Sequence, residues 1–177
     1  MSKMRIKEAL RDCGALMYGE FTLASGKKSR YYIDIKRAST DPQVLAEIAE
    51  EMAGLLAVKG MSYDRIAGVV LGSIPLAVAL SLRTGTPYVM VRKERKDHGT
   101  GKLIEGPMMQ NDRVLVVEDV VTSAGSSAEA VAILRDAGAK VSTVLAVIDR
   151  QEGGRERLAE MGVELISLLT AEDVLRE

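Results

Sequence analysis

The sequence is poor in the residues that build disulfides, metal clusters and aromatic surfaces. Among its 177 residues are one cysteine, one histidine, one phenylalanine and no tryptophan. The single cysteine, Cys13, excludes an internal disulfide and a cysteine-based metal cluster. No apolar run is long enough to span a membrane, and the charged start MSKMRIKEALRDCG is unlike a secretory signal. These features predict a cytoplasmic protein with no membrane partner.

The chain also lacks an excess of either charge, with a net charge of −1. It therefore offers no overall attraction to nucleic acid, which we do not expect as a partner. Hydrophobic residues make up 47% and charged residues 28%, a balance typical of soluble globular proteins. No repeat, low-complexity tract or linker interrupts the sequence, so we expect one domain over residues 1–177.

The stretch RVLVVEDVVTSAGSS, from Arg113 to Ser127, has the strongest functional pattern. Its apolar, β-branched start is typical of a buried parallel strand, and two adjacent carboxylates follow. A turn of small residues then leads into an amphipathic helix that Gly138 ends. Strand, turn and helix in this order point backbone N–H groups at an anion. Further hydroxyl donors come from Thr122, Ser123, Ser126 and Ser127.

Two interpretations of this stretch remain open on the residues alone. It carries neither G-x-G-x-x-G nor the lysine of a nucleotide-triphosphate loop. An ordinary strand–turn–helix connection with surface acids is one interpretation. The other is a phosphate site whose carboxylates meet sugar hydroxyls or a divalent cation.

The order of residues 114–126 resembles the signature with which type I phosphoribosyltransferases bind phosphoribosyl pyrophosphate (PRPP). By this resemblance Glu118 and Asp119 face the ribose hydroxyls and serve the ligand rather than folding, while residues 122–126 wrap the 5′-phosphate. The implied PRPP-binding residues in this stretch are Glu118, Asp119, Val120, Val121, Thr122, Ser123, Ala124, Gly125 and Ser126.

The pattern of apolar runs predicts an α/β fold. Strands are expected near residues 65–71, 87–91, 113–118, 140–148 and 163–168, alternating with helices. Such alternation favours a parallel sheet with helices on both faces. The resemblance adds the type I phosphoribosyltransferase fold, with a small N-terminal hood formed by about residues 1–36 plus C-terminal elements.

The segment FTLASGKKSRYYIDIK, residues 21–36, reads as two short strands around a glycine-containing turn. It could be a surface hairpin, or a hood over a flat ligand, because tyrosine offers a stacking face and a hydroxyl. The segment resembles the N-terminal part of orotate phosphoribosyltransferases, which implies that Tyr31 and Tyr32 lie beside the pyrimidine. Ala24 stands where many bacterial members have a ligand-binding lysine.

The stretch RKERKDHGTGK, residues 92–102, is rich in cations and glycine and predicts a solvated loop. It could be a basic hairpin tip, or a site for a compact anion. The stretch resembles the catalytic loop of orotate phosphoribosyltransferases. That resemblance implies that Arg92, Lys93, Lys96 and His98 meet the pyrophosphate, largely from across a homodimer interface.

A last candidate is the arginine of DRQEGG, residues 149–154, which follows an apolar strand. Arg150 could be a surface arginine paired with Asp149. Alternatively it binds a carboxylate, because ligands bind at strand carboxyl ends in open α/β sheets. The resemblance implies that Arg150 holds the orotate carboxylate, with Thr122 also on the orotate side.

Together these resemblances imply an orotate phosphoribosyltransferase that makes orotidine 5′-monophosphate and diphosphate for UMP biosynthesis. Lys96, His98 and Asp119 would be catalytic. No direct protein ligand to Mg²⁺ is expected: the ion would be held mainly by PRPP, and Asp119 is the one residue through which the protein could reach it. A purine or uracil phosphoribosyltransferase is an alternative that would need no carboxylate-binding arginine. A non-catalytic regulator is another, although no DNA-binding helix pair or broad basic face is visible.

Overall fold

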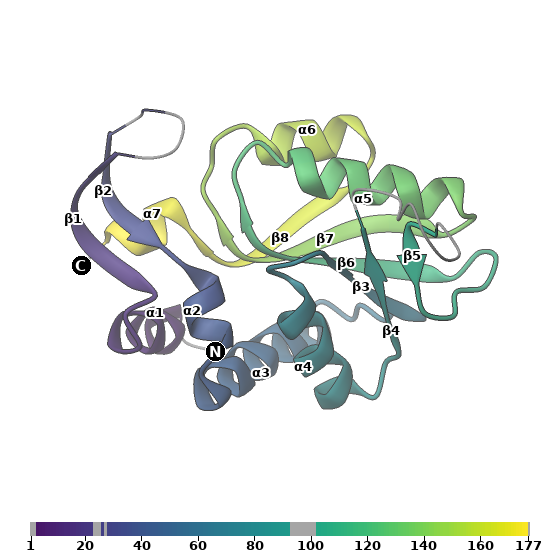
Figure 1. Ribbon diagram of the computed structural model, residues 1–177, viewed down its shortest axis with the longest axis horizontal. Helices are drawn as coiled ribbons and strands as arrows, with labels where there is room; N and C mark the ends of the chain where they lie inside the picture. The colour runs from purple at the N-terminus through teal and green to yellow at the C-terminus, as the bar shows by residue number, and fades with distance from the viewer. Residues whose placement is uncertain (1–2, 23–25, 27, 93–101, 177) are drawn as a thin grey trace.

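The computed structural model describes residues 3–22, 26, 28–92 and 102–176. A six-stranded sheet in the order β5-β4-β3-β6-β7-β8 forms the centre, and β1 pairs with β2 in a separate hairpin (Figure 1). All central neighbours are parallel except β4 and β5, so the predicted mostly parallel sheet is confirmed. The strands are β1 (Leu16–Thr22), β2 (Lys28–Ile33), β3 (Arg65–Val69), β4 (Tyr88–Val91), β5 (Ile104–Glu105), β6 (Arg113–Val121), β7 (Lys140–Asp149) and β8 (Glu164–Thr170).

Helices cover both faces of this sheet, with α3 and α4 on one face and α5 and α6 on the other (Figure 1). The hairpin, α1 and α7 lie together at one end of the molecule. No helix in the described ranges is long and apolar enough to cross a membrane. The helices are α1 (Lys3–Asp12), α2 (Ile35–Ser39), α3 (Pro42–Val58), α4 (Ile74–Thr84), α5 (Gly125–Asp136), α6 (Gly154–Glu160) and α7 (Ala171–Leu175).

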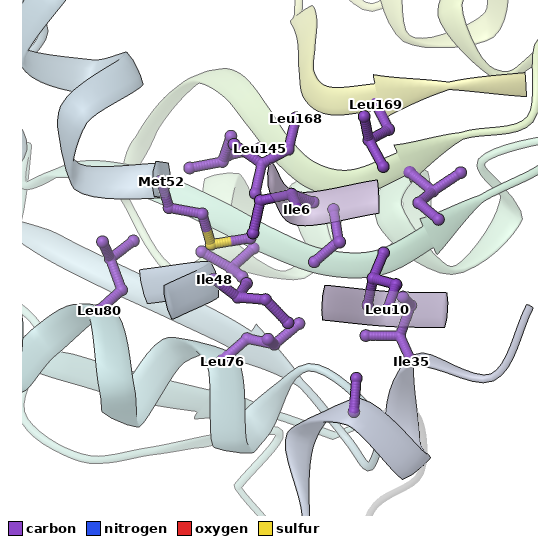
Figure 2. Packing of buried hydrophobic residues seen from close by; sticks show 14 of the residues in the cluster. Ile6, Leu10, Ile35, Ile48, Met52, Leu76, Leu80, Leu145, Leu168 and Leu169 are labelled. Atoms are coloured by element: carbon purple, nitrogen blue, oxygen red, sulfur yellow. The ribbon is translucent and has the colours of Figure 1, made fainter. Parts of the chain in front are cut away.

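Alternating residues of the central strands feed two apolar cores. In β6, Leu115 and Val117 pack toward α3 and α4, whereas Val114 and Val116 pack toward α5 and α6. Because successive strand side chains point to opposite faces, a strand covered on both faces must be apolar throughout. Figure 2 shows the first core, where helix residues such as Met52 meet Leu145 of β7. Each such side chain contributes about 1.5–3 kcal/mol by burial.

The structure differs from the expected strands at several strand ends and in one additional strand. The strand expected at residues 113–118 continues to Val121, because its last residues still pair with β7. The second strand of the hairpin ends at Ile33, since the Asp34 side chain accepts a hydrogen bond from Arg37 N (3.4 Å) and starts α2. The short β5 was not expected, because two residues carry no periodicity.

Candidate ligand-binding site at the carboxyl edge

Glu118, Asp119 and the turn that follows them lie where the strand order of the central sheet reverses. From β3 the chain crosses through α4 to β4 on one side, and from β6 it crosses through α5 to β7 on the other. The helices that follow these two neighbouring strands therefore leave to opposite faces. Open α/β sheets bind ligands at the carboxyl edge between two such turns, and we call the space between the turns after β3 and β6 the crevice.

Glu118 is buried and ties the two turns together. Its side chain is turned inward, leaving the residue 6% exposed. Ser73, at the start of α4, lies 3.3 Å from one carboxylate oxygen, and Ser127, in the first turn of α5, donates to the other at 3.1 Å. Glu118 therefore fixes the spacing between the two turns. Ser127, expected among the phosphate donors, is instead buried and bonded to Glu118.

Asp119, the next residue of β6, projects to the opposite face of the sheet from Glu118 and lies toward the crevice. Its side chain is 19% exposed and lies 4.0 Å from the Lys36 ammonium nitrogen. One carboxylate oxygen accepts a hydrogen bond from Val120 N at 2.7 Å. Gly72 passes so close that a Cβ there would overlap an Asp119 oxygen. Only glycine therefore lets the β3 turn approach this carboxylate.

The turn between β6 and α5 (residues 122–126) has the features of an anion site. Ala124 adopts a left-handed backbone conformation with φ of 56°, and no side chain caps the first N–H groups of α5. Thr122 and Ser123 are exposed. Uncapped N–H groups at a helix start, together with exposed hydroxyls, suit a phosphate.

Gly154, which lies outside the turn of residues 122–126, packs against the backbone of that turn. A Cβ on Gly154, the first residue of α6, would overlap the Thr122 carbonyl oxygen and would lie 2.7 Å from Val121 Cγ1. The start of α6 therefore packs directly against the backbone of the turn.

Arg150 lies at the end of β7 beneath the N-terminal hairpin. Its side chain is 12% exposed, and its Nε lies 2.9 Å from a Glu152 oxygen. No hydrogen bond in the described part of the chain satisfies this buried Nε. The alternative of a surface arginine paired with Asp149 is wrong, because Asp149 pairs with Arg155 at 2.9 Å.

The two tyrosines of β2 face different surroundings. Tyr31 is buried, and the Arg150 guanidinium carbon lies 5.2 Å from its ring centre. Burial raises the pKa of the Tyr31 hydroxyl, although Arg150 opposes this rise, so the hydroxyl stays protonated at neutral pH. Tyr32 is 40% exposed and packs its ring against Phe21 at 5.7 Å. The structure thus joins Tyr31, and not Tyr32, to Arg150.

Most of the predicted basic loop lies outside the described residues, including Lys93, Lys96 and His98; Ala24 lies outside them as well. The described ends of the loop lie side by side, since Arg92 N donates to Leu103 O at 2.8 Å and β5 pairs with β4. The loop therefore starts and returns at the carboxyl end of β4, two strands from β6.

A hollow of about 500 Å³ lies elsewhere, between α1 and α7. The described residues contain no group of three or more carboxylates, histidines and cysteines placed to hold a metal. Asp119 alone would supply one oxygen ligand, which fits a Mg²⁺ ion that is bound mainly through ligand oxygens.

Some residues that shape this site were missed in the sequence. Glu152 lies in the turn after β7 and Gly154 starts α6, and their nearness to Arg150 in the sequence could have marked them. Lys36 was placed in a strand, and only its location in α2 brings it to Asp119.

Comparison with known proteins agrees with this architecture. The model of the phosphoribosyl transferase domain family matches residues 37–167. The orotate phosphoribosyltransferase of Methanosarcina mazei is 50% identical over 98% of this chain and 92% of its own. Among solved structures, Mycobacterium tuberculosis orotate phosphoribosyltransferase with Fe(III) dicitrate has a TM-score of 0.84 at 34% identity, covering 98% of this chain and 99% of that one. The same enzyme in complex with PRPP has a TM-score of 0.79 at 32% identity, covering 97% and 98%.

A mostly parallel sheet with helices on both faces and a switch point between β3 and β6 defines the class as an open α/β-sheet protein. Within that class, the chain belongs to the phosphoribosyltransferase family, alongside the orotate phosphoribosyltransferases.

Proposed function

We propose that this chain transfers the 5-phosphoribosyl group of PRPP to orotate, giving orotidine 5′-monophosphate and diphosphate in UMP biosynthesis. The observation that carries the choice of orotate is the buried Arg150, whose Nε has no hydrogen bond among the described residues. A guanidinium held under a tyrosine at the carboxyl edge suits a planar, carboxylate-bearing ring. A purine or uracil carries no carboxylate for this guanidinium to bind.

Two parts of the site bind two parts of PRPP, its 5′-phosphate and its ribose hydroxyls. The 5′-phosphate lies against residues 122–126 and the start of α5, and the ribose hydroxyls lie against Asp119. Glu118 acts indirectly, because both its carboxylate oxygens face buried serines. Thr122 is exposed between the two substrates.

Asp119 is the described carboxylate that would contact Mg²⁺, and the bound ion would supply positive charge to the leaving diphosphate. The chain's own contribution is to place two anions together and to stabilise charge as the bond at C1′ of the ribose breaks. We infer that Arg92, Lys93, Lys96 and His98 supply positive charge at the diphosphate and that Lys96 and His98 act as catalytic groups. Loop closure would exclude water from the ribosyl cation.

The same loop motivates a homodimer with shared sites. It starts at β4, two strands from the phosphate turn, so its charged residues can serve a neighbouring subunit. Mixing Lys96→Ala chains with Asp119→Asn chains should restore activity, because one site of each mixed dimer collects neither defect. Mixed dimers that form and stay inactive would contradict shared sites.

A substrate panel tests the function directly. The protein is incubated with PRPP, Mg²⁺ and orotate, uracil, hypoxanthine or adenine in turn, and diphosphate release is measured. We expect turnover with orotate alone. Use of hypoxanthine with orotate untouched would overturn the proposal, and PRPP binding without any turnover would favour a non-catalytic regulator.

A further inference from the structure

Lys36 is the one described lysine that forms an ion pair with Asp119, the carboxylate of the crevice. It comes from α2, a five-residue helix that Asp34 starts and that packs against α3. Its stem also lies beside the β3 turn, since a Cβ built on Gly72 would be 3.4 Å from Lys36 Cε. A short helix from the N-terminal segment thus delivers a cation to the meeting point of two strand turns.

The geometry leaves this ammonium available to a ligand. Its nitrogen lies 4.0 Å from the Asp119 oxygen, which is too long for a hydrogen bond. The Lys36 side chain is 66% exposed, so its ion pair is weak and its ammonium group remains accessible. Asp119 keeps the ammonium near the site without holding it tightly.

The position relative to the ribose indicates which part of PRPP this group meets. If, as proposed above, the 5′-phosphate binds the turn after β6 and the ribose binds Asp119, the diphosphate would extend toward the other turn, after β3. Lys36 lies against that turn, through Gly72. We propose that Lys36 binds the diphosphate of PRPP and stabilises its charge as it leaves. This inference rests on the proposed function and adds a residue that neither the basic loop nor the phosphate turn contains.

Partial ligands separate direct binding from an indirect effect through Asp119. Inorganic diphosphate with Mg²⁺ and ribose 5-phosphate are each titrated calorimetrically into wild type, Lys36→Met and Lys36→Arg. Loss of a charge-assisted contact should weaken diphosphate by about tenfold in Lys36→Met. Ribose 5-phosphate should bind as in wild type, and Lys36→Arg should recover most of the loss. The control is Lys59→Met, because Lys59 pairs with Glu164 at the opposite, amino-terminal edge.

Steady-state kinetics complete the test. Lys36→Met should raise KM for PRPP and lower kcat, with KM for orotate unchanged. Unaltered diphosphate binding would overturn the inference, and so would equal weakening of both partial ligands, which would mean that Lys36 only positions Asp119. Wild-type and Lys59→Met turnover of orotate is measured alongside. Absence of that turnover would count against the proposed function instead, so the two failures are distinguishable.

Discussion

The two adjacent acids of β6 should respond differently to mutation. Glu118 is 6% exposed and bonded to Ser127, with Ser73 at 3.3 Å, whereas Asp119 is partly exposed and faces the crevice. Glu118→Ala should therefore destabilise the fold, and Asp119→Asn should leave the fold intact while weakening PRPP binding.

The structure sets the size of the Glu118 effect. A hydrogen bond to a charged group contributes about 1.5–3 kcal/mol. The Ser127 contact, at 3.1 Å, should carry most of this, because Ser73 also donates to Val69 O at 2.7 Å and keeps that bond. We expect Glu118→Ala to lower the free energy of unfolding by about 2–4 kcal/mol. For a chain of this length that corresponds to a fall in Tm of about 5–15 °C.

Asp119→Asn keeps the local hydrogen bond, because an amide oxygen can still accept from Val120 N. Its Tm should stay within about 2 °C of wild type. Calorimetric unfolding measures both Tm values, and titration with PRPP and Mg²⁺ measures binding. Glu118→Gln is the matched variant and should lose about 1 kcal/mol, since its amide can still bond both serines. An unchanged Tm in Glu118→Ala, or equal destabilisation by Glu118→Ala and Asp119→Asn, would refute a structural role for Glu118 and a ligand-binding role for Asp119.

Three further outcomes follow from single contacts. Arg150→Ala should raise KM for orotate at least about tenfold, with KM for PRPP much less affected, because the orotate carboxylate loses its cationic partner; unaltered orotate kinetics would move the carboxylate site elsewhere. Gly154→Ala should weaken PRPP binding, because its Cβ would push the phosphate turn at Thr122; normal PRPP affinity would show that the turn adapts. The Arg113 guanidinium lowers the pKa of Asp64 from 3.8 to about 2, so this pair stabilises the fold fully above pH 3.8 and loses its effect toward pH 2. Asp64→Asn should therefore flatten the acid-unfolding profile in that window, and an unchanged slope would contradict this.

The local pattern of the sequence was sufficient for the sheet and its helices. An apolar run such as Val114–Val117 has one outcome in a chain of this kind, because it must be covered on both faces. Asp41 and Pro42 likewise determine where α3 begins, since the Asp41 side chain accepts from Gln43 N and Val44 N. Signals of this type lie within a few residues of the structure that they determine.

The division of labour inside the site depended on contacts that no local pattern records. Glu118 and Asp119 look equivalent in sequence, yet neighbouring strand residues point to opposite sides. One of the two acids must therefore point into the interior. It is Glu118, which lies there beside Ser127 and Ser73, the latter 45 residues away in the sequence. The same limitation applied to Tyr31 and Tyr32, of which only Tyr31 packs against Arg150.

Lys36 shows most clearly why such contacts escape sequence analysis. The sequence pattern of residues 21–36 placed Lys36 in a strand, but the side chain of Asp34 starts a helix at the next residue. That change turns the Lys36 side chain toward Asp119, 83 positions further along the chain, and Gly72 leaves the space for the approach. A cap, a glycine and a carboxylate from three separate segments must all be in place before the cation reaches the crevice. A site built in this way gains its charge arrangement only once the sheet has formed, so its chemistry depends on the fold rather than on any one motif.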